Sequence, residues 1–210
     1  MKLGCSGCLG FLVLLGLASL LLWGAVAAGA RVLATPDLAV VAFSPGDGAR
    51  AQQKLFVLAR ASRRTETVTL SEAEVNALLT RHLVEARGIR LVAPRARLIG
   101  RDRFLLDSQR PLHSLLDELS MGVLADALPE RWRTRLLWIH LGGRVHTDRD
   151  RDQLRIEIDE LAVGRQRLPV TLVRLVLDPA SLGLLRWPLP AHIDHVGIEP
   201  GRLVFRVGER

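Results

Sequence analysis

Cysteine is nearly absent from this chain, and both copies, Cys5 and Cys8, precede a long hydrophobic run. The rest of the chain therefore contains no disulfide and no cysteine nucleophile, so it must fold by packing alone. The C-x-x-C spacing fits a redox or zinc pair, but no second pair of ligands accompanies it. We therefore expect inert or acylated cysteines at the edge of a membrane.

Aromatic residues are also scarce, at 4% of the chain, and tyrosine is absent. Any core or cavity must therefore be lined by leucine, valine, isoleucine and alanine. Such a lining suits acyl chains, although an ordinary protein core has the same composition. Composition alone leaves both interpretations open.

Lysine occurs only at Lys2 and Lys54, so arginine supplies nearly all of the positive charge behind a net charge of +7. The basic residues are interleaved with acids, as in Asp148 to Asp152, rather than gathered in one block. This pattern favours a solvated surface of mixed charge over a nucleic-acid patch. We expect no nucleic-acid partner.

The short motifs of common enzyme classes are missing. The chain has no G-x-S-x-G elbow, no H-E-x-x-H, and no phosphate-binding or dinucleotide-binding glycine pattern. We therefore predict no catalytic residue, no cofactor and no metal site. An envelope hydrolase built on His140, His146 and His192 is kept as an alternative, since the first two share one face of a predicted strand.

One hydrophobic segment, Leu9 to Ala30, carries neither charge nor proline. As a helix it would be about 33 Å long, which is enough to cross the hydrocarbon core of a bilayer. A cleavable signal peptide is the competing interpretation, because Ala25 to Ala27 and Ala28 to Ala30 offer small residues at the spacing that signal peptidase requires. The length of the segment favours a retained transmembrane anchor.

The charges on the two sides of this segment are nearly balanced, with Lys2 before it and Arg31 and Arg50 after it. The short leading tail favours an N-terminus on the inside. We therefore expect a single-pass protein of the inner membrane, with the C-terminal domain in the periplasm or otherwise outside the cytoplasm. The expected divisions are an anchor over 1–33, a linker and juxtamembrane helix over 34–66, and a soluble α+β domain over 67–210.

Two helices are predicted after the hydrophobic segment. Turn-forming residues at 44–48 precede a stretch at 49–62 that lacks glycine and proline and has apolar residues at helical spacing. The second helix begins at a capping box, in which Ser71 and Glu74 bond each other's backbone amides. Its apolar stripe consists of Val75, Leu78, Leu79 and Leu83, and it is expected to end near Gly88.

The middle of the chain reads as a hairpin followed by a helix. Alternation at 89–93 predicts a strand that Pro94 interrupts, and a hairpin is expected around Gly100 to Arg103. Helical spacing returns over 112–128 and ends at Pro129, although the Met121-Gly122 step weakens the case for one unbroken helix.

The longest strand pair follows, with one apolar and one wet face. Apolar residues alternate over 137–145 and again over 154–158, on either side of the charged turn at 148–152. The alternation slips by one between Ile158 and Leu161, which predicts a bulge or bend near Glu160.

Short elements are predicted for the end of the chain. Pro169 opens a helix over 170–177, and a second short helix is expected over 180–185. A hairpin over 193–198 and 203–207 closes the chain, joined by a type II turn with Pro200 and Gly201 at its centre.

Three segments carry a family resemblance: VTLSEAEVNALL at 68–79, GRQRLP at 164–169 and IDHVGIEPGRLVFR at 193–206. Together with the leading span, they resemble the YpmS-like family of single-span bacterial membrane proteins, and more distantly the tubular lipid-binding (TULIP-like) and AsmA-like proteins. The match covers about 68–83 and 165–206. No duplicated half is present, so a two-lobed tubular protein is not expected.

The resemblance implies an α+β fold, in which an N-terminal transmembrane helix is followed by a curved antiparallel β-sheet packed on one or two helices. It also implies an apolar groove that accepts a lipid tail, and no catalytic residue transfers from the family. The groove candidates are the apolar residues of the capped helix and of the long strand pair. They are Val75, Leu78, Leu79, Leu137, Ile139, Leu141, Leu154, Ile156 and Ile158.

The resulting hypothesis is a non-catalytic, membrane-anchored envelope protein that binds or handles lipid. Membrane lipid is its expected partner, with another envelope protein as a further candidate. An alternative is a scaffold that binds such a protein through an exposed strand edge or its arginine-rich surface.

Overall fold

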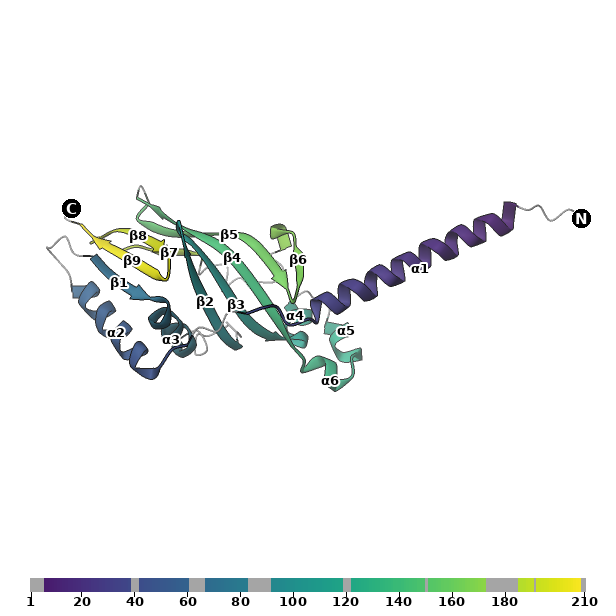
Figure 1. Ribbon diagram of the computed structural model, residues 1–210, viewed down its shortest axis with the longest axis horizontal. Helices are drawn as coiled ribbons and strands as arrows, with labels where there is room; N and C mark the ends of the chain where they lie inside the picture. Colours follow the sequence, from purple (N-terminus) through teal and green to yellow (C-terminus); the bar gives the residue numbers. More distant parts are fainter. Residues whose placement is uncertain are drawn as a thin grey trace, which may run out of the picture.

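A computed structural model describes residues 6–38, 42–60, 67–82, 92–118, 122–149, 151–172, 185–190 and 192–208. Figure 1 shows one long helix projecting from a body of strands and shorter helices. The body has the expected α+β class, and its described strands pair antiparallel. They form two sheets, however, where one was expected.

The projecting helix, α1, covers Ser6–Val32 and extends past both ends of the predicted hydrophobic segment. Its stretch Leu15–Val32 is long and apolar enough to cross a bilayer, and none of it is buried inside the body. Exposed leucines such as Leu20 and Leu21, together with Trp23, cover its surface. A helix of this composition is a candidate membrane anchor.

The larger sheet contains the predicted long hairpins. Its strands lie in the order β2-β3-β4-β5-β6, and β7 pairs with the other end of β5. Three helices, α4 to α6, connect β3 to β4. The bounds are β2 Val92–Gly100, β3 Arg103–Pro111, α4 Leu112–Glu118, α5 Gly122–Ala127, α6 Glu130–Arg133, β4 Leu136–Asp148, β5 Gln153–Val163, β6 Gln166–Leu168 and β7 Arg186–Pro188.

Two local predictions in this sheet have different outcomes. The bulge near Glu160 is confirmed, because Gly142 pairs with Glu160 while Gly143 pairs with Ile158, which leaves Asp159 as the extra residue. The interruption predicted at Pro94 takes the form of a break in the pairing with β3, whose register shifts between Val92 and Arg95, and not of an end of the strand. Residues 89–91 of that predicted strand lie outside the described residues. Proline lacks a donor, but β2 accommodates it at a register shift next to Ala93, whose φ is 49°.

The smaller sheet has the order β1-β9-β8 and lies at the far end of the body from α1 (Figure 1). The predicted C-terminal hairpin is confirmed, with Gly201 at φ 72° in its turn. Two helices accompany this sheet. The bounds are α2 Pro45–Arg60, β1 Thr67–Ser71, α3 Glu72–His82, β8 Ile193–Glu199 and β9 Arg202–Val207.

The residues predicted as a turn at 44–48 instead begin α2. Pro45 occupies the first helical position, where its missing N–H costs nothing. The Asp47 carboxylate accepts hydrogen bonds from the backbone N–H and the hydroxyl of Ser44, the latter at 2.7 Å. Ser-Pro-x-Asp is therefore a helix start, which the turn interpretation of Pro and Gly missed.

Several other expectations fall partly outside the described residues. The capped helix is confirmed as far as His82, but Leu83 and Gly88 are not described. The segment predicted as a helix over 112–128 contains α4 and α5, with 119–121 outside the described residues. After Pro169 the chain forms a 3-10 turn, η1, over Val170–Leu172; the rest of that predicted helix and most of 180–185 are not described.

The apolar core is divided into two clusters, and along β5 the change from one to the other falls between Ile156 and Ile158. The helix-proximal cluster includes Val32 and Leu33 from the end of α1, together with α4 and the adjoining ends of β4 and β5. The helix-distal cluster includes Leu58 of α2 and the smaller sheet. The buried members are Leu115, Leu137, Ile139, Leu141, Leu161 and Val163 in the former, and Leu58, Val68, Leu98, Val145, Ile193, Val196, Ile198 and Val207 in the latter.

Side chains of α3, the helix that directly follows β1 of the smaller sheet, bond to the backbone of β2 in the larger sheet. Asn76 is fully buried, and its amide bonds both the N–H and the carbonyl of Ala96 at 2.7 Å, as a neighbouring strand would. The Glu72 carboxylate accepts the N–H of Leu98 at 2.7 Å. The outer edge of β2 is thus closed by α3, which satisfies groups that would otherwise be open to strand addition.

Candidate functional site

The junction between α1 and the body is the feature most directly tied to a membrane. The carbonyl of Arg31, in the last turn of α1, accepts the N–H of Arg165 at 2.8 Å in the turn between β5 and β6. The Arg165 guanidinium also reaches the Thr35 carbonyl and the Asp37 carboxylate, each at 3.2 Å. The exit of the helix is therefore attached directly to the larger sheet.

Gly164 makes this close approach sterically feasible. Its φ is 60°, and a Cβ at this position would collide with the carbonyl oxygens of Arg31 and Val32. Only glycine combines that backbone conformation with the space needed for the passing helix end. Val32 and Leu33 then pack into the helix-proximal cluster, so the junction is both hydrogen-bonded and apolar.

The nine groove candidates do not all come together. Four belong to or pack against the helix-proximal cluster, namely Leu137, Ile139, Leu141 and Ile158. Three pack against the helix-distal cluster, namely Val75, Leu154 and Ile156. Leu78 and Leu79 lie half-buried on α3.

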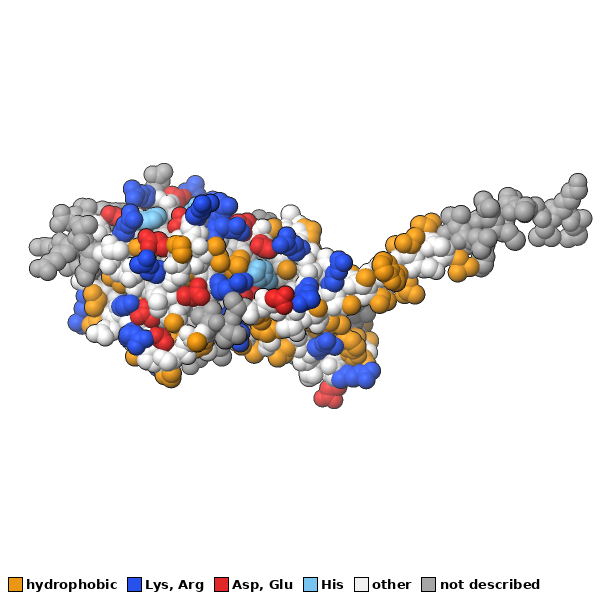
Figure 2. Space-filling view, viewed as in Figure 1, with side chains coloured by type: hydrophobic (Ala, Val, Ile, Leu, Met, Phe, Trp, Pro, Cys, Tyr) orange, Lys and Arg blue, Asp and Glu red, His pale blue; other side chains and the backbone are white. Residues whose placement is uncertain are grey.

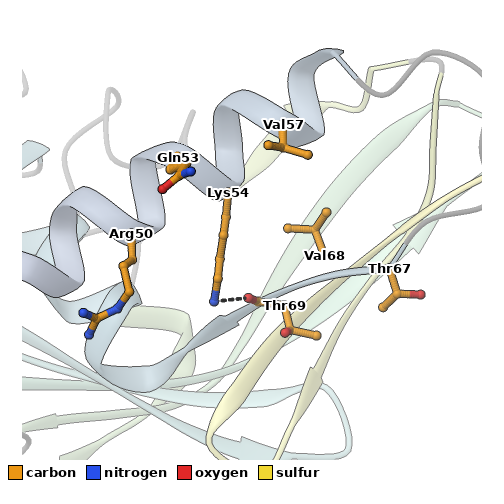
Figure 3. Close-up of a pocket in the computed structure, with 7 residues that line it drawn as sticks. All are labelled: Arg50, Gln53, Lys54, Val57, Thr67, Val68 and Thr69. Carbon is orange, nitrogen blue, oxygen red and sulfur yellow. Dashed lines mark hydrogen bonds between the residues drawn. The ribbon is translucent and has the colours of Figure 1, made fainter.

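A pocket of about 430 Å³ lies elsewhere, between α2 and the outer edge of β1 (Figure 3). None of the nine groove candidates lines it. Figure 3 shows Lys54 reaching from α2 to the strand, while Arg50 extends from the preceding turn of the helix. Its lining residues are Arg50, Gln53, Lys54, Val57, Thr67, Val68 and Thr69.

The charges at this pocket are largely compensated. The Lys54 ammonium donates to the Thr69 carbonyl at 2.9 Å and to the Glu74 carboxylate at 2.8 Å. Arg50 pairs with Asp47 and lies 3.9 Å from Glu74. Because both cations already face carboxylates, the pocket has little charge left for an anionic ligand, and its polar groups chiefly hold α2 against β1.

Glu74 is the buried centre of this arrangement, with 3% of its side chain exposed. Burial by itself would raise the pKa of Glu74, but the hydrogen bonds from Lys54 and Ser71 and the charge of Lys54 outweigh it and hold the pKa below its usual value. The predicted capping box is confirmed, since the Ser71 N–H donates to Glu74 at 2.7 Å and the Glu74 N–H donates to Ser71 at 3.2 Å. Through Thr69 and Ser71, this network also closes the outer edge of β1.

The histidines considered for a hydrolase pair with different carboxylates. His140 Nδ1 lies 2.6 Å from Asp107 Oδ1, whereas His146 Nε2 lies 3.4 Å from Glu157. His192 lies in the turn before β8. Within the described ranges, no group of three or more His, Cys, Asp or Glu side chains could hold a metal ion.

The other carboxylates of this sheet face arginines. Asp159 lies 3.2 Å from Arg103 and 3.4 Å from Arg144, while Glu160 lies 3.7 Å from Arg167. Figure 2 shows the same interleaving of positive and negative side chains over the visible face of the body, in contrast to the hydrophobic surface of α1. This is the solvated surface that the sequence predicted.

Sequence reasoning missed the residues that make the junction. Gly164 and Arg165 lie within the GRQRLP segment, but nothing in that segment signals contact with residues more than a hundred positions earlier. The only sequence signal for this contact is a glycine followed by an arginine in a tight turn, and that pair is too common to predict a specific contact.

Comparison with known proteins identifies no family for this chain. No protein-family model matches this chain, and no curated protein is detectably similar to it.

Proposed function

We propose that this chain is a single-span membrane protein, and that its exported body binds bilayer lipid through the helix-proximal cluster without catalysing a reaction. The observation that carries the proposal is the attachment of the α1 exit to the body. Because Arg31 bonds Arg165 while Val32 and Leu33 enter the cluster, the apolar interior begins where the apolar helix ends.

The chemistry of the cluster suits this role. Its aliphatic side chains offer an acyl chain dispersion contacts. Two buried polar residues of β3, Ser108 and Arg110, pair with Ile139 and Leu137 on the same face of the sheet. A lipid tail following α1 out of the bilayer would meet Leu137, Ile139, Leu141 and Ile158 before the helix-distal residues. These four are the groove candidates that support the proposal.

The topology belongs to the same proposal, with α1 retained, the N-terminus in the cytoplasm and the body outside it. Reporter fusions at the C-terminus test this arrangement. An enzyme active only in the periplasm should be active, and a fluorescent protein that folds only in the cytoplasm should be dark. The mass of the purified chain should include α1; a mature chain beginning after Ala27 or Ala30 would identify a signal peptide instead.

Photocrosslinking tests lipid binding. The full chain is placed in nanodiscs that contain phosphatidylcholine with a diazirine in its acyl chain, irradiated and digested for mass spectrometry. We expect adducts on peptides from β4 and β5 as well as on α1. Adducts confined to α1 would contradict lipid binding by the body while leaving the anchor intact.

Two variants of β5 provide a matched comparison. Ile158→Asp places a charge at the helix-proximal cluster and should abolish the β4 and β5 adducts. Ile156→Asp places the same charge two residues away, against the helix-distal cluster, and should leave them. Circular dichroism of both variants verifies that each retains its fold.

A further inference from the structure

The part of the body beside the base of α1 exposes apolar side chains. Val123 of α5 is 85% exposed, more than any other large hydrophobic residue in the described part of the chain. Leu136 at the start of β4 and Val170 of η1 are also exposed. Side chains of this kind are costly in water when they lie close together, and they commonly mark an interaction surface.

These residues are held near the level at which α1 leaves the body. Val32 and Leu33 pack against the cluster that includes Leu112 and Leu115 of α4, and α4 in turn contacts α5 and α6. Figure 1 shows α5 and β6 on either side of the base of α1, with the smaller sheet at the opposite end. If α1 crosses a bilayer, its direct attachment to the body keeps α5 and α6 close to that bilayer.

The charges next to these apolar residues favour an anionic surface. Arg131, Arg133 and Arg135 alternate along α6 and the residues after it, and the Arg135 guanidinium lies 5.3 Å from the ring centre of Trp132. Tryptophan is enriched at the membrane–water interface, and arginine guanidinium groups bind phosphate oxygens. Three exposed carboxylates, Asp117, Asp126 and Glu130, oppose the three arginines, and exposed Arg31 of α1 leaves one net positive charge.

We propose that the surface formed by α5, α6 and the start of β4, here called the basal surface, rests on the same bilayer that α1 crosses and binds its anionic headgroups. Val123 inserts among the lipids, while the arginines contact phosphates. The proposal rests on the proposed function in one respect, since it requires α1 to span the membrane. It does not require lipid to enter the helix-proximal cluster.

The test uses the full chain with Cys5 and Cys8 replaced by serine and one cysteine introduced for an environment-sensitive fluorophore. Val123→Cys reports the basal surface. Phe56→Cys is the matched control, because Phe56 is 54% exposed on α2 at the opposite end of the body. Leu20→Cys, in α1, reports insertion of the helix. Each labelled chain is placed in nanodiscs with lipids that carry a nitroxide quencher.

We expect strong quenching at positions 20 and 123 and little quenching at position 56. Replacing neutral lipid by phosphatidylglycerol should increase quenching at position 123, and Arg131→Gln, Arg133→Gln and Arg135→Gln together should remove that increase. Each arginine near an anionic surface changes binding about fivefold, so the triple variant should show a clear loss.

The outcomes separate the two proposals. Quenching at position 20 without quenching at position 123 would overturn the basal surface and leave the anchor in place. Absence of quenching at position 20 would overturn both. Quenching at position 123 that is equal in neutral and anionic nanodiscs would overturn the assignment to anionic headgroups.

Discussion

The helix-proximal and helix-distal halves of the body share β4 and β5 but are stabilised by different interactions. The distal half is joined by buried polar side chains that bond strand backbones, as Asn76 does with Ala96 and Thr147 does with Val196. The proximal half is joined to α1 by apolar packing and by a backbone hydrogen bond at Arg165. Its buried polar side chains, such as Asp107, lie on β3 and α4 and not at the contact with α1.

This difference has a physical consequence for function. Buried hydrogen bonds require fixed geometry, so the distal half should tolerate little rearrangement. Aliphatic contacts lack direction and can be exchanged for contacts with an acyl chain. The contacts that a lipid could replace in the proximal half are therefore the aliphatic ones around Val32 and Leu33.

The largest expected effect comes from removing the buried hydrogen bonds between Asn76 and the backbone of Ala96 in the distal half. Asn76→Leu leaves the N–H and carbonyl of Ala96 without their buried partner, and two such groups together should cost about 3 kcal/mol. Thermal unfolding of the full chain in detergent measures the change. Thr80→Ala is the control, because Thr80 bonds only the Asn76 carbonyl within the helix, and it should cost about 0.5 kcal/mol or less. Equal losses of stability in the two variants would contradict a stabilising role for the bonds between Asn76 and Ala96.

A smaller effect is expected at the junction of the proximal half. Gly164→Ala places a Cβ against the end of α1 at a φ of 60°, and should cost about 2 kcal/mol from backbone strain and crowding together. Gly201→Ala is the matched control, since Gly201 has a φ of 72° but open space around its Cβ position. It should cost about 1 kcal/mol from strain alone.

The junction variant also has a local readout. Because the collision displaces the end of α1, proteolysis within residues 31–38 should be faster in Gly164→Ala than in Gly201→Ala. Equal protection in both variants would mean that the docking of α1 does not depend on Gly164.

Much of the fold was predictable where its cause is local. The Ser71 and Glu74 capping box, the turn at Pro200 and Gly201, and the phase slip that marks the Asp159 bulge are each specified by a few neighbouring residues. Local patterns also misled where one motif has two meanings, as in Ser44 to Gly48, which begins a helix rather than forming a turn.

The arrangement in space was less predictable. The capping box places Asn76 within a helix, but its bonds to Ala96 depend on which strand lies opposite. The division of the groove candidates between two clusters depends likewise on how the sheets pack, because periodicity identifies an apolar face and not its partner. Periodicity therefore predicted which faces are apolar better than how those faces pack together.

The smallest expected effect concerns the charge network at Glu74 in the distal half, whose contribution to stability depends on pH. The pKa of Glu74 is held below its usual value of 4.5, so the ionised form stabilises the folded state. This contribution is complete above the unfolded pKa and is lost as the pH falls through the lower folded pKa.

Glu74→Gln should therefore cost about 1.5 kcal/mol at pH 7, with a deficit that shrinks below about pH 4.5. Glu157→Gln, at exposed pairs with His146 and Arg155, should change stability by about 0.5 kcal/mol or less at pH 7. Unfolding measured from pH 7 to pH 3 tests both; a Glu74→Gln deficit that grows on acidification would contradict the sign of the shift. Asp47, whose pKa is also lowered, by its hydrogen bonds with Ser44 and by Arg50, should leave a residual pH dependence in every variant.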